Sequence, residues 1–401
     1  MPSSYHAIDR APGRDYLTRT VERSTDRILT THAGSLARPD DLRELLIARD
    51  SGRLYDVAAF AARVRGAVAD VVARQAAAGL DIINDGEESK RNFTTYARER
   101  LGGVEGRELA TDERILAQIY GQDAQEFPEY FAGRGNMAGR EAVCKAPLRY
   151  IGHAAVETDI ANFKAALSGL SVTETFLPAV APGTIEHWLG NDHYPSEETY
   201  LAAVAEAMKV EYDAIVRAGF LLQIDDPDLA DAWQIHRTMS LAEYRKFAAR
   251  RVEALNHALR DIPPERVRFH VCWGSYHGPH KHDLPLRDLV DLILAVRAQA
   301  YSIEASNPRH EHEWRVWEDV KLPEGKILIP GVVGHASDFV EHPELVAERI
   351  VRYARLVGRE NVIAGTDCGL GPRVGHPKIA WAKFEALVEG ARLATRQLWG
   401  R

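Results

Sequence analysis

The feature that most constrains the fold is a series of eight short apolar runs, most of them separated by stretches with helical periodicity. The runs are rich in β-branched residues, as buried strands are. They lie at residues 28–35, 82–87, 174–180, 220–226, 267–273, 301–304, 327–333 and 361–368. Repeated strand and helix alternation, without a G-x-G-x-x-G motif after the first strand, favours a closed parallel barrel over an open dinucleotide-binding sheet. The sequence therefore predicts an α/β fold, a (β/α)8 TIM barrel.

The intervening stretches carry helix signals, and one region departs from the alternation. Ser240 and Glu243 form an S-x-x-E capping box ahead of a helical apolar pattern. Between about 98 and 152 the periodicity fades, which predicts an insertion after the second strand, near the mouth of the barrel, where long excursions often act as lids. We expect a polar N-terminal extension over 1–27 and a single barrel domain over 28–401.

Composition narrows the class of protein. The 401 residues carry a formal net charge of −8, which argues against nucleic acid or an anionic membrane as the main partner. The three cysteines, Cys144, Cys272 and Cys368, lack disulfide-like spacing and suit a reducing compartment. No apolar run approaches the roughly 20 residues of a membrane span. We therefore expect a cytoplasmic enzyme, and the sequence leaves open whether its chains associate into a homo-oligomer.

A candidate metal site lies at the ends of three predicted strands. His270 and Cys272 are two residues apart in one strand, so their side chains point to the same face. Imidazole nitrogen and thiolate sulfur are preferred donors to zinc. Glu304 and Cys368 end two later strands, and the C-terminal ends of barrel strands converge on one mouth. A lone His-x-Cys in an apolar run is more often part of the core, so it is the convergence of four donors that favours Zn²⁺.

Other strand ends add polar side chains to the same mouth. These side chains are Ser35, Glu87, Asp225, Asp226 and His335. Simpler interpretations exist for most of them. The two aspartates could cap a helix, Glu87 could be a surface carboxylate, and His335 could be solvated on its loop.

The ordered motifs resemble the catalytic barrel of the cobalamin-independent methionine synthase family, and within it the epoxyalkane:coenzyme M transferase branch. The motifs are Gly34-Ser35, Gly86-Glu87, Gln223-Ile224-Asp225, His270-x-Cys272, Ser302-Ile303-Glu304 and Asp367-Cys368-Gly369. The resemblance runs from about Ile28 to the C-terminus. Three segments look like the transferase branch: Trp273 to His280, Asp225-Asp226-Pro227, and Arg309 to Trp314.

The resemblance implies that His270, Cys272, Glu304 and Cys368 bind one zinc ion, which in turn binds a thiol substrate as the thiolate. A free thiol has a pKa of about 8.5 and is mostly protonated at neutral pH, so coordination is what makes it a nucleophile. As the most weakly held ligand, Glu304 is expected to yield when the substrate sulfur arrives. His335 occupies the position of a proton-handling histidine in the family, and we predict that it protonates the departing oxygen or nitrogen.

The leading hypothesis from the sequence is a zinc-dependent alkyltransferase that joins a small thiol such as coenzyme M to an electrophilic carbon, with an epoxide as the donor. The alternative is methyl transfer to homocysteine, for which Ser35, Glu87 and Asp225 would hold the amino acid. A structural zinc in a non-catalytic binding protein fits less well, because structural sites are usually compact clusters of neighbouring ligands.

A sulfonate thiol would need cations at a mouth that is otherwise acidic. Arg38 is the first candidate, because it lies three residues beyond Ser35, and Lys90 and Arg91 follow the second strand. A guanidinium group matches paired oxygens of a sulfonate as it does those of a carboxylate or phosphate. The simpler interpretation of Arg38 is a solvated loop arginine.

Overall fold

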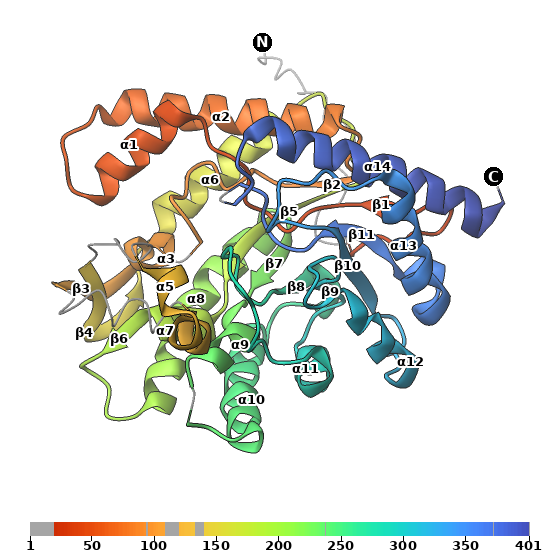
Figure 1. Ribbon diagram of the computed structural model, residues 1–401. Coiled ribbons are helices and arrows are strands. Elements are labelled where there is room, and N and C mark those ends of the chain that lie inside the picture. The colour runs from red at the N-terminus through yellow and green to blue at the C-terminus, as the bar shows by residue number, and fades with distance from the viewer. Residues whose placement is uncertain are drawn as a thin grey trace, which may run out of the picture.

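The computed structural model describes residues 20–93, 95–108, 120–132, 140–236, 238–371 and 373–400. Eight parallel strands form one sheet in the order β1-β11-β10-β9-β8-β7-β5-β2. Their bounds are β1 Leu29–Thr30, β2 Ile82–Ile83, β5 Glu174–Val180, β7 Leu221–Asp225, β8 Val267–Val271, β9 Ala300–Glu304, β10 Ile327–Val333 and β11 Ile363–Thr366. The eight predicted strands are therefore confirmed, and Figure 1 shows them at the centre of the molecule with helices around them.

The two ends of that strand order meet and close the sheet into a barrel. The N–H of Asp81, just before β2, donates to the carbonyl of Thr30 in β1 at 3.2 Å. The hydroxyl of Thr31 donates to the carbonyl of Ile82 at 3.1 Å. The predicted (β/α)8 barrel is thus the observed fold, with its closure at the seam between β1 and β2.

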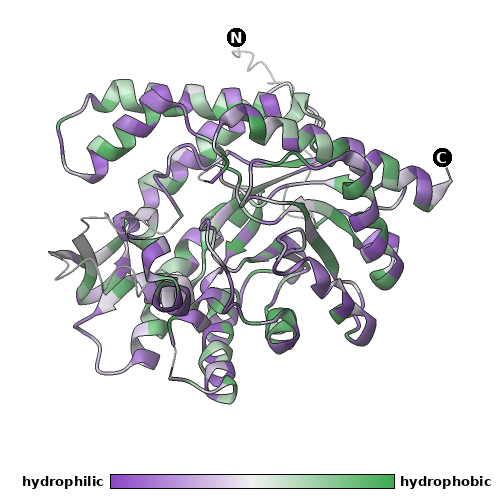
Figure 2. Cartoon of the chain, viewed as in Figure 1, coloured by the Kyte–Doolittle hydropathy of each residue, from purple (hydrophilic) through white to green (hydrophobic). Residues whose placement is uncertain are grey.

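Helices surround the barrel and bury their apolar faces against it. The main ones are α1 Asp40–Asp50, α2 Val57–Ala77, α6 His153–Ala166, α7 Pro182–Trp188, α8 Glu197–Arg217, α9 Asp228–Asp231, α10 Leu241–Ala258, α11 Val290–Ala295, α12 Val316–Asp319, α13 Pro343–Val357 and α14 Pro377–Trp399. Strands β5 and β10 are buried at every position, since one face fills the barrel and the other packs on helices. Figure 2 shows hydrophobic strands inside and mixed helices outside.

Local sequence signals set several of the helix ends. The Ser240 hydroxyl accepts the N–H of Glu243 at 3.3 Å, and the Glu243 carboxylate accepts the N–H of Ser240 at 2.8 Å, which confirms the predicted capping box of α10. Helix α13 begins with Pro343 at a position where a missing N–H costs no hydrogen bond. Among the described helices, none has both the length and the apolar character to cross a membrane.

A small second sheet lies beside the barrel, at the left in Figure 1. In the segment predicted as an insertion, 98–152, β3 (Leu101–Glu108) pairs antiparallel with β4 (Arg140–Tyr150). Strand β6 (Leu189–Asn191), from the loop after β5, adds to β4 in parallel. The short helices α3 (Thr95–Arg100) and α5 (Pro128–Phe131) belong to the same segment, and residues 109–119 and 133–139 lie outside the described residues.

The described end of the predicted N-terminal extension packs on the barrel. Residues 1–19 lie outside the described part of the chain. The N–H of Val21 donates to the carbonyl of Glu265 at 3.0 Å, and the hydroxyl of Ser24 donates to the carbonyl of Val362 at 2.6 Å. Val21 is 2% exposed and joins an apolar cluster with Leu29 and residues of other barrel strands. This segment therefore covers the face of the barrel opposite to the mouth.

A buried ionic network ties the insertion to the helices of the barrel. Arg100 at the end of α3 forms ion pairs with Asp159 of α6 and, at 3.0 Å, with Glu211 of α8. The Tyr150 hydroxyl at the end of β4 donates to the same Glu211 carboxylate at 2.6 Å. Because two buried carboxylates depend on one guanidinium, removing the cation leaves both of them uncompensated.

We expect Arg100→Met to lower the free energy of unfolding by about 3–5 kcal/mol, the typical cost of breaking a buried ion pair by removing one partner. Equilibrium unfolding in urea measures this loss. Arg392→Met is the matched control, because Arg392 pairs with Glu389 on the exposed face of α14 and should be silent. Equal urea midpoints for the Arg100 variant and the unmodified protein would contradict the role of the network.

Candidate metal centre

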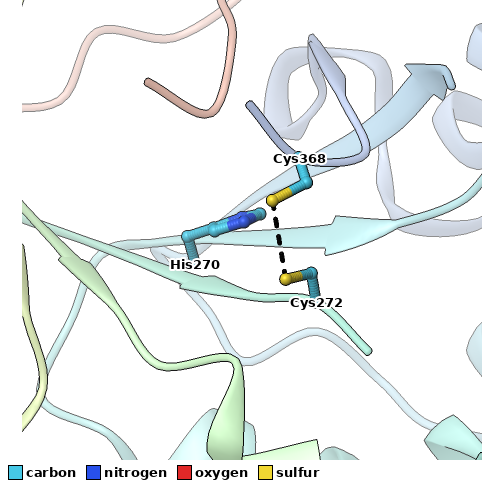
Figure 3. Close-up of side chains that lie close together, drawn as sticks. All are labelled: His270, Cys272 and Cys368. Atoms are coloured by element: carbon cyan, nitrogen blue, oxygen red, sulfur yellow. Dashed lines mark hydrogen bonds between the residues drawn. The ribbon is translucent and has the colours of Figure 1, made fainter. Parts of the chain in front are cut away.

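Two strands bring an imidazole and two thiols together at the mouth of the barrel. His270 lies in β8, Cys272 directly follows that strand, and Cys368 follows β11. Their ligand atoms all lie within 4.8 Å of one another. The two sulfur atoms are 3.5 Å apart, and Figure 3 shows the His270 ring directed toward the Cys368 sulfur. The structure thus places three of the four predicted zinc ligands in one cluster.

The hydrogen bonds of His270 leave one ring nitrogen available. His270 Nδ1 lies 3.1 Å from the hydroxyl of Ser302, on the neighbouring strand β9. His270 Nε2 is buried and makes no hydrogen bond of acceptable geometry within the described residues. Metal-binding histidines usually have this arrangement, in which one nitrogen is held by a neighbour and the other faces the ion. The donor set therefore fits a zinc ion.

The two thiols are electrostatically unequal. The hydrogen-bonding contact with Cys272 lowers the pKa of Cys368 well below its usual range. The same contact, together with burial, raises the pKa of the Cys272 thiol. The pair therefore favours one thiolate and one thiol, and thiolate is the form that binds a metal.

Glu304, the fourth predicted ligand, lies beside this cluster and not within it. Its Oε1 accepts the N–H of Trp273 at 2.9 Å and its Oε2 accepts the Nδ2 amide of Asn307 at 3.0 Å. Its carboxylate oxygens come within 4.8 Å of ligand atoms of His335 and Asp367 instead. Two neutral donors thus stabilise the carboxylate in this position, and its participation in a four-ligand set stays a prediction.

His335 is buried next to acidic groups. It is 0% exposed, which excludes the interpretation of a solvated loop histidine. Neither of its ring nitrogens has a hydrogen-bond partner in the described part of the chain. The neighbouring Asp367 carboxylate is fully engaged, because it accepts N–H groups of Ala305 and Ser306 and the Ser306 hydroxyl. Burial and the charge of Glu304 raise the pKa of Asp367 to about 8.

Two more predicted carboxylates are buried at the mouth. Glu87 follows Gly86 in a turn where both residues have positive φ, 58° and 68°, a conformation that is costly for glutamate. Its side chain is 4% exposed, and its Oε2 accepts no hydrogen bond from the described residues but forms an ion pair with Arg38 at 3.9 Å, so it is not a simple surface carboxylate. Asp225 accepts the Gln223 amide at 2.9 Å, and burial raises its pKa to about 7.

Of the paired aspartates, Asp226 contacts the start of helix α9: burial raises the pKa of its carboxyl to about 7, and a backbone hydrogen bond from Leu229 in the first turn of α9 opposes that rise. The N-cap of that helix is Pro227, and it has no side-chain capping hydrogen bond. The Asp226 carboxylate also accepts the hydroxyl of Thr184 at 2.9 Å. Asp226 therefore links α7 to the start of α9, whereas Asp225 is the acid that remains for the mouth.

The three candidate cations are all engaged by protein groups. Arg38 donates to the carbonyl of Glu87 at 2.7 Å and to the hydroxyl of Ser35 at 3.4 Å. Lys90 donates to the carbonyl of Pro178 at 2.8 Å and lies over the Tyr96 ring. Arg91 is on the surface, 44% exposed and 3.3 Å from Asp50. Arg38 thus braces the two loops that carry Ser35 and Glu87.

Sequence reasoning missed a buried network of charged groups behind Trp273. The two ring nitrogens of His310 lie 2.9 Å from Asp283 and 2.8 Å from Glu313. Although burial opposes protonation, these carboxylates raise the pKa of His310 to about 10. The charged ring stacks on Trp273 with centroids 4.2 Å apart, and Trp273 in turn holds Glu304. The i, i+3 spacing of His310 and Glu313 was the signal that could have revealed part of it.

Comparisons with known proteins give matches along almost the whole chain. A family model described as the catalytic domain of cobalamin-independent synthase matches residues 28–392. Methionine synthase of Thermococcus kodakarensis is 24% identical over 372 residues, covering 92% of this chain and 94% of that protein. The enzyme of the same name from Sulfurisphaera tokodaii is 26% identical over 373 residues, with 92% and 93% covered.

Solved structures show the same fold. A B12-independent methionine synthase from a Shewanella species, in complex with selenomethionine, superposes with a TM-score of 0.70 at 18% identity, covering 94% of this chain and 100% of that one. A putative vitamin-B12-independent methionine synthase from Listeria monocytogenes gives a TM-score of 0.65 at 16% identity, with 91% and 98% covered.

We expect the purified protein to hold about one zinc ion per chain, since the donors form a single tetrahedral-type site. Cys272→Ala and Cys368→Ala should each abolish this binding, as measured by elemental analysis after dialysis. Cys144→Ala is the matched control, because Cys144 is a buried cysteine of β4 that belongs to the small second sheet. Full zinc content in both site variants would reject the metal assignment.

Proposed function

Because this chain belongs to the family of cobalamin-independent synthase catalytic domains, we propose that it is a zinc-dependent methyltransferase that alkylates the sulfur of homocysteine or a close analogue. The family match extends over almost the whole chain. The observation that carries the proposal is the cluster of His270, Cys272 and Cys368 at the barrel mouth. It provides imidazole and thiolate donors at the face where barrel enzymes carry out their chemistry.

The protein groups divide the work around the metal. When bound, zinc would be held by His270, Cys272 and Cys368 with Glu304, and would keep the substrate sulfur deprotonated at neutral pH. The donors from Trp273 and Asn307 give the Glu304 carboxylate a stable position beside the cluster. If Glu304 moves off the metal when the substrate sulfur binds, its carboxylate would therefore still be hydrogen-bonded by Trp273 and Asn307.

The charges at the mouth support an amino-acid thiol. Glu87 Oε2 accepts no hydrogen bond from the described residues and lies 3.9 Å from the Arg38 guanidinium, and the charge of Glu87 contributes to the raised pKa of Asp225, a second buried acid. A substrate ammonium group would satisfy both, and hydrogen bonds between charged groups are stronger than neutral ones. The relatives named methionine synthase point to the same substrate.

The second candidate is the joining of a sulfonate thiol such as coenzyme M to an epoxide, which the motifs around Trp273 first suggested. The structural observation in its favour is Arg38, whose side chain is 9% exposed at the mouth and whose Nε has no hydrogen-bond partner among the described residues. Its two terminal nitrogens are already engaged with Ser35 and Glu87. The comparisons support methyl transfer to homocysteine better than this candidate.

His335 is the proposed proton donor to the leaving atom of the methyl donor. Its imidazole is buried, free of protein hydrogen bonds in the described region, and close to Glu304 and Asp367. These features suit a group that must hydrogen-bond to a substrate in order to be satisfied.

We expect His335→Asn to lower kcat by about 10²–10⁴-fold, the usual contribution of a general acid, with zinc content and thiol affinity unchanged. Steady-state kinetics and metal analysis measure the two effects. His257→Asn is the control, because His257 pairs with Glu206 on the surface, 53% exposed. A His335 variant with the full kcat under chemistry-limited conditions would refute the acid role.

The substrate is tested by comparing homocysteine with its analogue that lacks the amine, 4-mercaptobutanoate, and with coenzyme M. We expect Glu87→Gln to weaken homocysteine binding by about 1.5–3 kcal/mol, the value of a charge-assisted hydrogen bond, and to leave the analogue unaffected. Calorimetry on the zinc-loaded protein measures each affinity.

Glu88→Gln is the matched control for this test. Glu88 is the next residue and is equally buried, and burial raises the pKa of both carboxyls, that of Glu88 to about 8, so a loss of affinity confined to the Glu87 variant would show that position and not burial decides the effect. Tight binding of coenzyme M with none of homocysteine, together with selective loss of coenzyme M binding in Arg38→Ala, would instead establish the second candidate.

A further inference from the structure

The chain segment that carries His335 needs an anchor other than the imidazole itself. Residues 334–342, here called the His335 loop, connect β10 to α13 at the barrel mouth. The His335 ring makes no hydrogen bond within the described residues. Its orientation must therefore come from packing and from its backbone.

The backbone is held by a carboxylate from the other end of the same loop. Glu341 Oε1 accepts the N–H of Gly334, the residue before His335, at 2.8 Å. A Cβ atom at Gly334 would lie only 3.3 Å from that oxygen and 3.4 Å from the Ser306 hydroxyl. The loop is thus closed on itself directly beside the candidate acid, with little space to spare.

A buried lysine from the last helix fixes this carboxylate. Lys383 of α14 is 0% exposed, and its ammonium lies 3.0 Å from Glu341 Oε2. The same ammonium donates to the carbonyl of Phe339, in the middle of the loop. Lys383 therefore binds the loop at two points and holds Glu341 in the geometry that Gly334 requires.

We propose that Glu341 and Lys383 are positioning residues that orient His335 for proton transfer, acting from α14 through the Gly334 N–H. This inference rests on the proposed function, because it assumes that His335 is the acid. A buried ion pair gains little net stability over an apolar pair of similar volume, since the desolvation of both charges offsets their attraction. The main effect of the Glu341–Lys383 pair is therefore to fix the geometry of the His335 loop.

The main test removes both charges together, so that neither is left buried alone. In Glu341→Leu/Lys383→Met we expect kcat to fall by about 10²-fold, the typical cost of a 1 Å misplacement near the reacting groups. The KM for the thiol and the zinc content should stay unchanged, because neither residue is one of the donors in the cluster of His270, Cys272 and Cys368. Unchanged kcat in the double variant would overturn the proposal.

Two single variants serve as rescue and control. Glu341→Gln keeps an oxygen that accepts the Gly334 N–H, so its kcat should recover most of what the double variant loses. Glu389→Gln breaks an exposed ion pair with Arg392 on the same helix and should have no effect. A Gln variant as slow as the double variant would show that the hydrogen bond to Gly334 is not what matters.

Combination with His335→Asn separates positioning from a general structural role. If the pair acts only through His335, adding Glu341→Leu/Lys383→Met to His335→Asn lowers kcat no further. If the fold-losses of kcat from His335→Asn and from the double variant multiply in the combined variant, the inference is rejected. If His335→Asn alone leaves kcat unchanged, the acid role in the proposed function fails.

Hydrogen exchange tests the anchor without any activity assay. Mass spectrometry of peptides that span 330–341 should show faster amide exchange in the double variant than in the unmodified protein and in Glu389→Gln. Equal exchange rates would show that Glu341 and Lys383 do not hold the loop, whatever the enzyme's substrate proves to be.

Discussion

The parallel pairing of β7 through β11 is the constraint on which the candidate site depends. Register places His270 of β8 opposite Ser302 of β9, so that the serine hydroxyl reaches the ring nitrogen of the histidine. Gly331 of β10 stands opposite Glu304 of β9 and Gly365 of β11. A Cβ atom at Gly331 would lie 2.4 Å from the Cα of Asp367, so only glycine lets the Cys368 loop approach this closely. The cluster of donors is therefore a property of the strand register as much as of the ligands themselves.

Electrostatics at the mouth distinguishes the two candidate substrates in a way that residue types alone do not. Near the first two strands the sequence offers both an acid, Glu87, and bases, Arg38, Lys90 and Arg91. In the folded chain Glu87 Oε2 accepts no hydrogen bond within the described residues and has only a long ion pair with Arg38 at 3.9 Å, whereas Arg38 and Lys90 donate to carbonyl groups and a hydroxyl. A substrate ammonium group could bind the Glu87 carboxylate directly, whereas a sulfonate would have to displace the hydrogen bonds that Arg38 and Lys90 make to the loops. This difference, together with the methionine synthase relatives, shifts the preferred hypothesis from the sulfonate thiol to homocysteine.

Much of the fold and part of the site could be predicted because the signals are local. Buried strands appear as short apolar runs, a capping box needs only Ser240 and Glu243, and the two-residue spacing of His270 and Cys272 fixes a shared face. What could not be predicted depends on partners far apart in the chain. Tertiary packing determines three such contacts. Trp273 and Asn307 donate to Glu304, the charged His310 ring stacks on Trp273, and Arg38 donates to the carbonyl of Glu87. The type of a side chain limits which partners it can bind, and the tertiary structure determines which of them it does bind.

The seam between β1 and β2 gives the two halves of the mouth different mechanical stiffness. These strands have two residues each, and much of their link runs through side chains: the Asp81 carboxylate accepts the N–H and hydroxyl of Thr30, and the Thr31 hydroxyl donates to the carbonyl of Ile82. The strands that carry His270 and Glu304 are longer and paired on both sides. Ser35 and Glu87 follow the short strands, so the end of the site that would grip the substrate backbone is built on the compliant side of the barrel. Local opening at this seam would thus move Ser35 and Glu87 before His270 and Glu304.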